Sequence, residues 1–389
     1  MKAAHWRPSP LTREALAIAL VTRAGLAFIA WLSLRALPRL GLHPAQLPDF
    51  FLPSHPALDA WTRWDTSHYV AVAQFGYGYP VSPSPHGGAG FFPLYPLLMR
   101  SLVEITRVAV TPGALAVAGL IIANLSFLLA VPLLARLTAD HLGEDAGRQA
   151  ALLLCVAPFG FFFNAAYSES LFMAISLGAL LLARRNRFGL AAILAALGSA
   201  TRLVGLALLP ALLVLAWRRK APLRDVVAIL FISPLGTVAY GAYLAWTVGD
   251  PFAYFRAQVT WGDWNDHVRF YVSLFLFHPR DTLFGDPRHL IIVLNVAVGL
   301  VFLTLLPRVW RLLDPGTALF TTLLVVVQGA ATWVSLGRYL LPAVGVWIVA
   351  GALITRPGWS GWPRDIIVAT SALLLAALTV LFGHGFWVV

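Results

Sequence analysis

Charged residues are scarce in this sequence. They make up 12% of its 389 residues, whereas 59% are hydrophobic, and a soluble globular chain carries roughly twice that charged fraction. Several apolar runs reach about 20 residues, the length of helix that crosses the hydrocarbon core of a bilayer. No polar block of domain size separates these runs. The composition therefore excludes an ordinary soluble domain and predicts an all-α polytopic membrane protein with one membrane domain over residues 1–389.

Cysteine and lysine are also nearly absent. The single cysteine, Cys155, lies in an apolar run, which excludes an intrachain disulfide and a cysteine metal site. Arginine supplies nearly all of the basic charge, a composition typical of GC-rich bacterial genomes, so we expect a bacterial plasma-membrane protein. The net charge of +11 does not indicate nucleic-acid binding. The basic residues lie in short clusters beside apolar runs and form no groove with interleaved aromatic residues.

Motifs for nucleotide binding are missing as well. The sequence contains neither a glycine-rich loop that could cradle phosphates nor a nucleotide-binding βαβ unit. His267 lies close to Asp263 and Asp266, but no spacing in this region demands a metal ion. The sequence therefore gives no indication of a cofactor, and it leaves a divalent metal open.

The apolar runs themselves predict the architecture. The four runs between 149 and 217 are too short to cross a bilayer upright, so we expect helix ends to converge on a polar cavity at the outer face. The first run is too long and too interrupted by arginine for a cleaved signal peptide, and it is predicted as a retained helix. About eleven transmembrane helices are expected, near 13–37, 111–136, 149–166, 168–183, 188–200, 203–217, 225–247, 288–306, 315–335, 338–355 and 365–383.

Basic residues predict the orientation of these helices. With the N-terminus in the cytoplasm, every tight basic cluster falls in an inner connection, as the positive-inside rule requires. The outer side then holds two long connections, 38–110 and 248–287, and an outward C-terminus. The inner clusters are Lys2, Arg7 and Arg13; Arg136 and Arg148; Arg184, Arg185 and Arg187; Arg218, Arg219, Lys220 and Arg224; Arg308 and Arg311; and Arg356 and Arg364.

The first long outer connection carries a dense polar cluster. Its stretch "RWDTSHYVAVAQFGYGY" begins at Arg63 and contains Asp65 and His68, which would share a helix face because they are three residues apart. A carboxylate at the mouth of a cavity can take the proton of an acceptor hydroxyl. The alternative interpretation is that Asp65 caps a helix. The wider stretch "ALDAWTRWDTSHYVAVAQFGYG" is predicted as an amphipathic helix. The later stretch "GFFPLYPLLMR", interrupted by Pro93 and Pro96, is predicted as a helix in or near the membrane interface.

Further polar candidates stand at other outer junctions. Arg202 and Arg338 lie on the predicted outer side, whereas the basic clusters lie on the inner side. Each arginine needs a counter-anion, which a protein carboxylate or a ligand phosphate could supply. Glu169 opens a helix, where the helix dipole alone would favour an acidic residue. In the second long connection, Gln258 and Trp261 lie among tryptophans that suit either sugar stacking or an interfacial aromatic belt.

Taken together, these segments resemble the PIG-V-like mannosyltransferases of the GT-C superfamily of membrane glycosyltransferases. The resemblance runs from about residue 60 to 345. In one departure, Leu203 and Val204 follow the arginine of "SATR", where the family often has polar residues. The matching stretches, in order, are "RWDTSHYVAVAQFGYG", "GFFPLYPLLMR", "YSESLFMAISLGALLLARR", "LGSATRLVGLALLPALL" and "SLGRYLLPA".

The resemblance implies a GT-C-like helical bundle, an activity and a set of site residues. The activity is the transfer of mannose from a polyprenyl-phosphate-mannose donor to a glycolipid or glycan hydroxyl at the extracytoplasmic face, with inversion. Asp65 would be the catalytic base, and Arg202, Arg338 and His68 would bind the donor phosphate. The partners would be the lipid-linked donor, the acceptor and membrane lipids, with no nucleic acid. The acceptor- and sugar-binding candidates are Glu169, Arg63, Trp64, Tyr167, Gln258, Trp261 and Tyr339.

Three alternatives stay open. Outer arginines and broken helices also suit a transporter or flippase for a lipid-linked sugar, although the polar residues gather on one side and no internal repeat is apparent. The same chemistry with a non-mannose sugar is not distinguished by the sequence. A noncatalytic scaffold of the same fold is the third alternative, and the presence of Asp65, Arg202 and Arg338 weakly opposes it.

Overall fold

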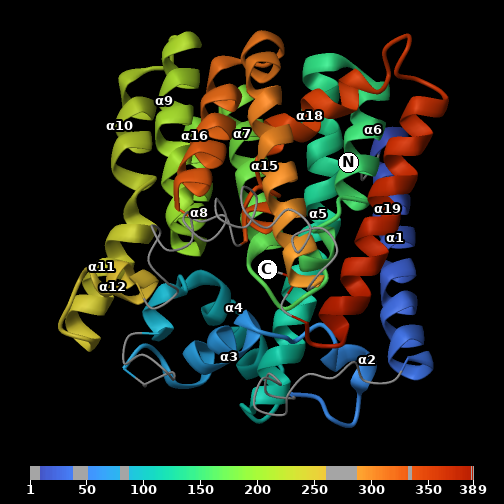
Figure 1. Cartoon of the computed structure of the whole chain (residues 1–389). Helices are drawn as coiled ribbons and strands as arrows, with labels where there is room; N and C mark the ends of the chain where they lie inside the picture. The colour runs from blue at the N-terminus through green and yellow to red at the C-terminus, as the bar shows by residue number, and fades with distance from the viewer. Residues whose placement is uncertain are drawn as a thin grey trace, which may run out of the picture.

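The computed structural model describes residues 9–37, 51–78, 87–259, 287–331, 335–386 and 388, and within these ranges it contains helices and no strands (Figure 1). Several helices are long and apolar enough to cross a membrane, and shorter apolar helices pack among them. The prediction of an all-α polytopic membrane protein is therefore confirmed. The long spans are Pro10–Ala36 (α1), Pro112–Leu142 (α5), Leu223–Thr247, Ile291–Leu312 within α15, and Trp362–Gly383 (α19).

Two of the long helices begin at side-chain caps. The Ser9 hydroxyl accepts a hydrogen bond from the Thr12 backbone N–H at the start of α1, and the Thr111 hydroxyl accepts one from Ala114 at the start of α5. Each cap is followed by a proline, whose fixed φ and missing N–H suit the first helical position. Their apolar sequences then continue as unbroken helix for 27 and 31 residues.

The remaining helices fill the bundle between these spans. α5 packs against α6 and α7, and α6 packs against α18, so the core lies where these four helices meet. The bounds are α6 Glu144–Cys155, η3 Gly160–Phe163, α7 Glu169–Arg184, α8 Phe188–Thr201, η4 Leu203–Ala207, α9 Leu208–Arg218, α10 Leu223–Ile232, α11 Leu235–Thr247, α12 Ala253–Val259, α15 Pro287–Leu312, α16 Pro315–Ala331, α17 Leu336–Tyr339 and α18 Val344–Leu353.

Some predicted spans are interrupted where a continuous helix was expected. The run 149–166 leaves the α-helix after Cys155, and the run 338–355 is divided between α17 and α18. Pro158 and Pro342 lie in these two interruptions and lack the backbone N–H that would continue a helix. Residues 159–170 are nevertheless buried throughout. Non-helical backbone at membrane depth is thus enclosed by protein, which is where it is tolerated.

The described part of the first long connection folds into short helices at one end of the bundle. α2 (Pro56–Asp59), α3 (Asp65–Phe75), η2 (Gly87–Gly90) and α4 (Leu94–Ile105) lie at the same end as α11 and α12 (Figure 1). The sequence favoured one amphipathic helix across α2 and α3, but the chain breaks before Asp65. Trp64 adopts a positive φ of 55°, which a bulky side chain rarely adopts, and the backbone turns there.

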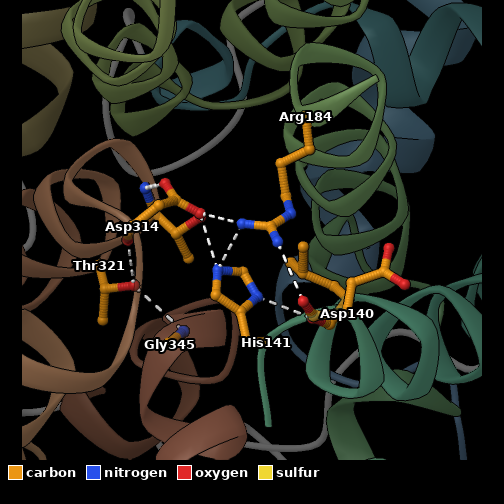
Figure 2. Close-up of polar contacts among 8 residues, drawn as sticks. Asp140, His141, Arg184, Asp314, Thr321 and Gly345 are labelled. Atoms are coloured by element: carbon orange, nitrogen blue, oxygen red, sulfur yellow. Dashed lines mark hydrogen bonds and ion pairs between the residues drawn. The ribbon is translucent and has the colours of Figure 1, made fainter. Parts of the chain in front are cut away.

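At the opposite end, a polar cluster joins three helices from distant parts of the sequence. Asp314 begins α16 by accepting the Thr317 backbone N–H through Oδ1 at 2.9 Å. Its Oδ2 lies 2.7 Å from Nε2 of His141 on α5 and 2.5 Å from Nη1 of Arg184 on α7. Figure 2 shows both side chains pointing toward Asp314. The cluster therefore fixes the ends of α5 and α7 against the start of α16.

The surroundings of Asp314 also determine its acidity. Burial alone would raise the pKa of Asp314, but hydrogen bonds from His141 and the Thr317 backbone, together with the Arg184 charge, hold this pKa well below its ordinary value. A carboxyl whose folded pKa is depressed stabilises the fold above its unfolded pKa of about 3.9, and this contribution is lost as the pH falls below that value.

We expect Asp314→Asn to lower the free energy of unfolding at neutral pH by about 1–3 kcal/mol, because the amide removes the charge that Arg184 and His141 face. Thermal unfolding of both proteins in the same detergent measures this difference. The gap between their melting temperatures should narrow as the pH falls below about 4. A gap that stays constant from pH 7 to pH 3 would contradict the assigned role of the carboxylate.

Candidate active site

Asp65 is the first residue of α3, and its carboxylate faces α17. Oδ2 lies 2.7 Å from Nη2 of Arg338. The side chain is 17% exposed, and the described residues form no hydrogen bond with Oδ1. The alternative interpretation of Asp65 as an N-cap is wrong, because Trp64 occupies the cap position without a side-chain bond. The carboxylate is thus held through one oxygen, and the other is left for a ligand.

Arg338 connects Asp65 to a second carboxylate. Its Nε lies 2.5 Å from Oε1 of Glu169, and Nη1 of Arg202 lies 2.8 Å from the same oxygen. Arg338 and Glu169 are almost completely buried, at 3% and 0% side-chain exposure, whereas Arg202 is 14% exposed. Four residues predicted separately therefore form one chain of alternating charges: Asp65, Arg338, Glu169 and Arg202. We call this chain the charge network.

The helix ends explain how these side chains meet. Glu169 begins α7, and Arg202 directly follows α8, which ends at Thr201. Arg338 lies in the short α17, after the interruption that precedes α18. Helix interruptions thus bring side chains from four segments to one place. Each arginine was predicted to need a counter-anion, and protein carboxylates supply it for both.

Aromatic rings surround the two arginines. The Cζ atom of Arg338 lies 4.6 Å from the ring centroid of Tyr167 and 5.2 Å from that of Phe162. The Tyr339 ring centroid is 5.0 Å from Cζ of both Arg338 and Arg202. A guanidinium beside an aromatic ring gains about 0.5–2 kcal/mol, the more so where water is excluded. The rings therefore hold the guanidinium planes and shield them from water.

Tyr167 also joins the first long connection to the interrupted segment before α7. Its hydroxyl donates to the Arg63 backbone carbonyl at 3.0 Å and accepts the Asp65 backbone N–H at 3.2 Å. These two bonds fix the backbone turn that presents the Asp65 carboxylate. Tyr167 was predicted to contact acceptor or sugar, and the structure places its hydroxyl against backbone and its ring against Arg338.

Two contacts of the site were missed by the sequence analysis. The Tyr69 hydroxyl lies 2.8 Å from Oγ of Ser168, which is 3.4 Å from Nη1 of Arg202. Both side chains are buried. Ser168 stands beside Glu169 in the "YSES" stretch, and Tyr69 is one turn of helix after Asp65. This spacing was the available signal, because residues four apart share a helix face.

The other candidates from the first connection lie around the charge network. His68 stacks on Phe91 with ring centroids 4.6 Å apart. Burial lowers the pKa of His68, and the nearby Asp65 charge opposes this shift. Arg63 pairs with the buried Asp59 at 2.5 Å.

The indole N–H of Trp64 donates to the Phe386 backbone carbonyl at 3.2 Å. Trp64 thus ties the turn before α3 to the residues that follow α19. Gln258 is exposed on α12, which packs against η2. Trp261, Asp263, Asp266 and His267 lie outside the described residues. Within the ranges described, no group of three or more His, Cys, Asp or Glu side chains could hold one metal ion.

Gly337 lets α17 approach the interrupted segment closely. A Cβ atom at this position would lie 2.3 Å from two ring carbons of Phe159, which is buried. The Gly337 backbone N–H also donates to Oδ1 of Asn295 on α15 at 2.7 Å. The position of Arg338 therefore depends on the missing side chain of the residue before it.

The fold and the site together define an integral membrane protein with a buried charge network at one end of a helical bundle. Residues 53–219 match the family model described as mannosyltransferase (PIG-V). The matched range contains Asp65, Glu169 and Arg202, whereas Arg338 lies beyond it. The resemblance inferred from the sequence motifs is thereby confirmed over these residues.

Curated relatives agree with the family match. The chain is 31% identical over 222 residues to GPI alpha-1,6-mannosyltransferase 2 of Cricetulus griseus, covering 52% of this chain and 42% of that protein. It is 30% identical over 158 residues to the Homo sapiens protein of the same description, covering 38% of this chain and 30% of that protein. The chain therefore spans less than half the length of these relatives.

Solved structures of similar shape are more distant. An Archaeoglobus fulgidus oligosaccharyltransferase tethered to an acceptor peptide has a TM-score of 0.45 at 13% identity, covering 95% of this chain and 55% of that chain. The apo form of that enzyme has a TM-score of 0.44 at 15% identity, covering 94% of this chain and 55% of that chain. Values this low identify no function.

We expect Gly337→Ala to lower turnover at least tenfold, because the new methyl group must push α17 and Arg338 away from the Phe159 ring. The measurement is the initial rate per folded molecule of whatever reaction the wild-type protein catalyses. Gly189→Ala is the matched control, since a Cβ there meets nothing within 4 Å. Equal rates for the two variants would contradict the assigned role of Gly337.

Proposed function

We propose that the protein is an inverting glycosyltransferase that moves mannose from a polyprenyl-phosphate-mannose donor to a hydroxyl of a glycolipid or glycan. The observation that carries this proposal is the Asp65 carboxylate held by Arg338 at 2.7 Å, within a buried network that contains a second arginine. The PIG-V family match and the mannosyltransferase relatives support mannose as the sugar.

Asp65 is proposed as the general base. Arg338 fixes Oδ2, so the carboxylate cannot rotate freely, and Oδ1 remains to accept the proton of the acceptor hydroxyl. The hydroxyl oxygen then forms a bond to the anomeric carbon as the bond from that carbon to the phosphate oxygen breaks. The phosphate leaves with the electron pair, and attack from the opposite face inverts the configuration. A positioned general base contributes about 10²–10⁴ to the rate of such a step.

The two arginines are proposed to stabilise the leaving phosphate. Their environments differ, because Arg338 already contacts two carboxylates, whereas Glu169 is the one carboxylate that Arg202 contacts among the described residues. Arg202 is also the more exposed of the two. Arg202 is therefore the principal phosphate contact, and Arg338 chiefly orients Asp65. Preorganised donors aimed at developing charge supply much of the rate enhancement in sites shielded from water.

Glu169 is proposed as the shared counterion of both arginines. One of its oxygens accepts from both guanidinium groups, which holds them at a fixed separation before the donor arrives. His68 has a lowered pKa, so it would approach the donor as a neutral hydrogen-bonding group rather than as a cation. The acceptor and sugar contacts are proposed to come from the exposed Gln258 and from Trp261.

The proposed location is the plasma membrane of a bacterium, with the charge network at the extracytoplasmic face and the N-terminus in the cytoplasm. α7 supports this orientation, because Glu169 begins it and Arg184 ends it. Its 16 residues separate the two ends by about 24 Å. The basic end of α7 would face the cytoplasm by the positive-inside rule, which leaves Glu169 on the outer side.

A transfer assay tests the proposal. Purified full-length protein in nanodiscs receives radiolabelled polyprenyl-phosphate-mannose and total lipid from the native host. We expect a labelled lipid or glycan product from the wild type, and a turnover reduced about 10²–10⁴-fold in Asp65→Asn. The asparagine retains an oxygen for Arg338, so donor affinity should change by no more than a few fold.

Asp145→Asn, an exposed carboxylate at the other end of the bundle, is the matched control and should keep full turnover. If Asp65→Asn turns over as fast as the wild type, Asp65 is not the general base. Donor binding without any product would favour the transporter alternative, which a liposome flip assay then measures. In sealed membrane vesicles of uniform orientation, cysteines placed at Ser101 and Ser360 should react with an impermeant maleimide from opposite sides, and labelling of both from one side would overturn the orientation.

A further inference from the structure

One buried cation in the bundle has no part in the proposed reaction. Arg23 lies within α1 and is 7% exposed. Its Nη1 donates to the Gly160 carbonyl at 2.9 Å and to Oδ1 of Asn164 at 2.8 Å, and its Nη2 donates to the Cys155 carbonyl at 2.9 Å. Its Cζ lies 4.4 Å from the ring centroid of Phe127. Among the described residues, no carboxylate lies within ion-pair distance of Arg23.

The acceptors of Arg23 explain why a charge is buried there. α6 ends at Cys155, so no following helical turn supplies a backbone donor for the Cys155 carbonyl. A carbonyl without a donor is costly at membrane depth, where water does not reach it. The partial negative charge at the end of α6 and the face of the Phe127 ring offset the charge of the guanidinium. An apolar side chain at position 23 would leave all three oxygens without this donor.

The segment that Arg23 holds leads directly into the charge network. Residues 156–168 connect α6 to α7, and Asn164 lies three residues before Tyr167 and five before Glu169. Nδ2 of Asn124, on α5, donates to the Asn164 backbone carbonyl at 3.2 Å. Asn164 is therefore hydrogen-bonded by two helices: α1 contacts its side chain and α5 contacts its backbone carbonyl.

We propose that Arg23 is a positioning residue for the active site. It fixes residues 156–168, and this segment places the Tyr167 hydroxyl against the Asp65 backbone and the Glu169 carboxylate against Arg338. Loss of the guanidinium would release the segment and loosen both contacts. The conformational part of this inference stands without the proposed function, and only its catalytic consequence rests on that function.

Cys155 provides a direct reporter of the segment. It is the single cysteine of the chain and is fully buried, and its carbonyl accepts from Arg23. The experiment measures the rate at which a small permeant maleimide labels Cys155 in the full-length protein, well below the melting temperature. We expect Arg23→Met and Asn164→Ala to be labelled at least tenfold faster than the wild type. Asn164→Ala removes one of the three hydrogen bonds of Arg23. It therefore provides the test if Arg23→Met does not fold.

Two further variants separate positioning from general loss of stability. Arg184→Met removes another arginine by the same substitution, but at the opposite cluster around Asp314. It should lower the melting temperature and leave both Cys155 labelling and turnover per folded molecule unchanged. Asn164→Asp retains an acceptor oxygen for Arg23 and should keep the slow labelling and the turnover of the wild type.

The turnover readout uses the transfer assay described above. Arg23→Met and Asn164→Ala should lower kcat at least tenfold per folded molecule, because Tyr167 and Glu169 no longer hold the base and the arginines in place. Unchanged labelling in both variants overturns the proposal, and so does faster labelling with unchanged turnover. If the wild type transfers no sugar, the proposed function fails, and the labelling comparison alone then decides whether Arg23 fixes the segment.

Discussion

The site depends on the bonds that Arg338 forms with two carboxylates. Its Nη2 contacts Asp65 at 2.7 Å, its Nε contacts Glu169 at 2.5 Å, and all but 3% of its side chain is buried. Removing one partner of a buried ion pair costs about 3–5 kcal/mol, because the remaining charge stays desolvated. The network therefore requires its members to be present together. The two arginines and two carboxylates are formally neutral until an anionic ligand enters.

Helix interruptions make this arrangement possible inside an apolar bundle. Uninterrupted helices would satisfy their own backbone groups, but they would not end where Glu169 and Arg338 meet. Each interruption exposes backbone groups that side chains must satisfy, and the structure uses Arg23 for the carbonyls after α6 and Asn295 for the Gly337 N–H. Buried polar side chains far from the reaction are thus a consequence of building a polar site at membrane depth.

The apolar runs were sufficient to predict the helical membrane class. The polar outliers Asp65, Glu169, Arg202 and Arg338 were singled out one by one, and the structure brings them together. Their contacts were not predictable, because the pairing of Arg338 with both carboxylates depends on tertiary packing between α3, α7 and α17. The break before Asp65 was missed because the sequence around it fits one amphipathic helix, whereas the Trp64 backbone turns. Arg23 was not singled out, because one arginine within the first predicted helix gives no sign in the sequence that it is buried and hydrogen-bonded.

The proposed function depends on the binding of a lipid-linked phosphate at the charge network, and equilibrium binding of a short-chain polyprenyl phosphate in nanodiscs measures this step. Arg202→Gln removes the more accessible arginine, whereas Arg185→Gln removes an exposed arginine at the other end of α7. We expect Arg202→Gln to bind at least tenfold more weakly than the wild type and Arg185→Gln to bind as the wild type does. Equal affinities for wild type and Arg202→Gln would contradict a phosphate site at this network.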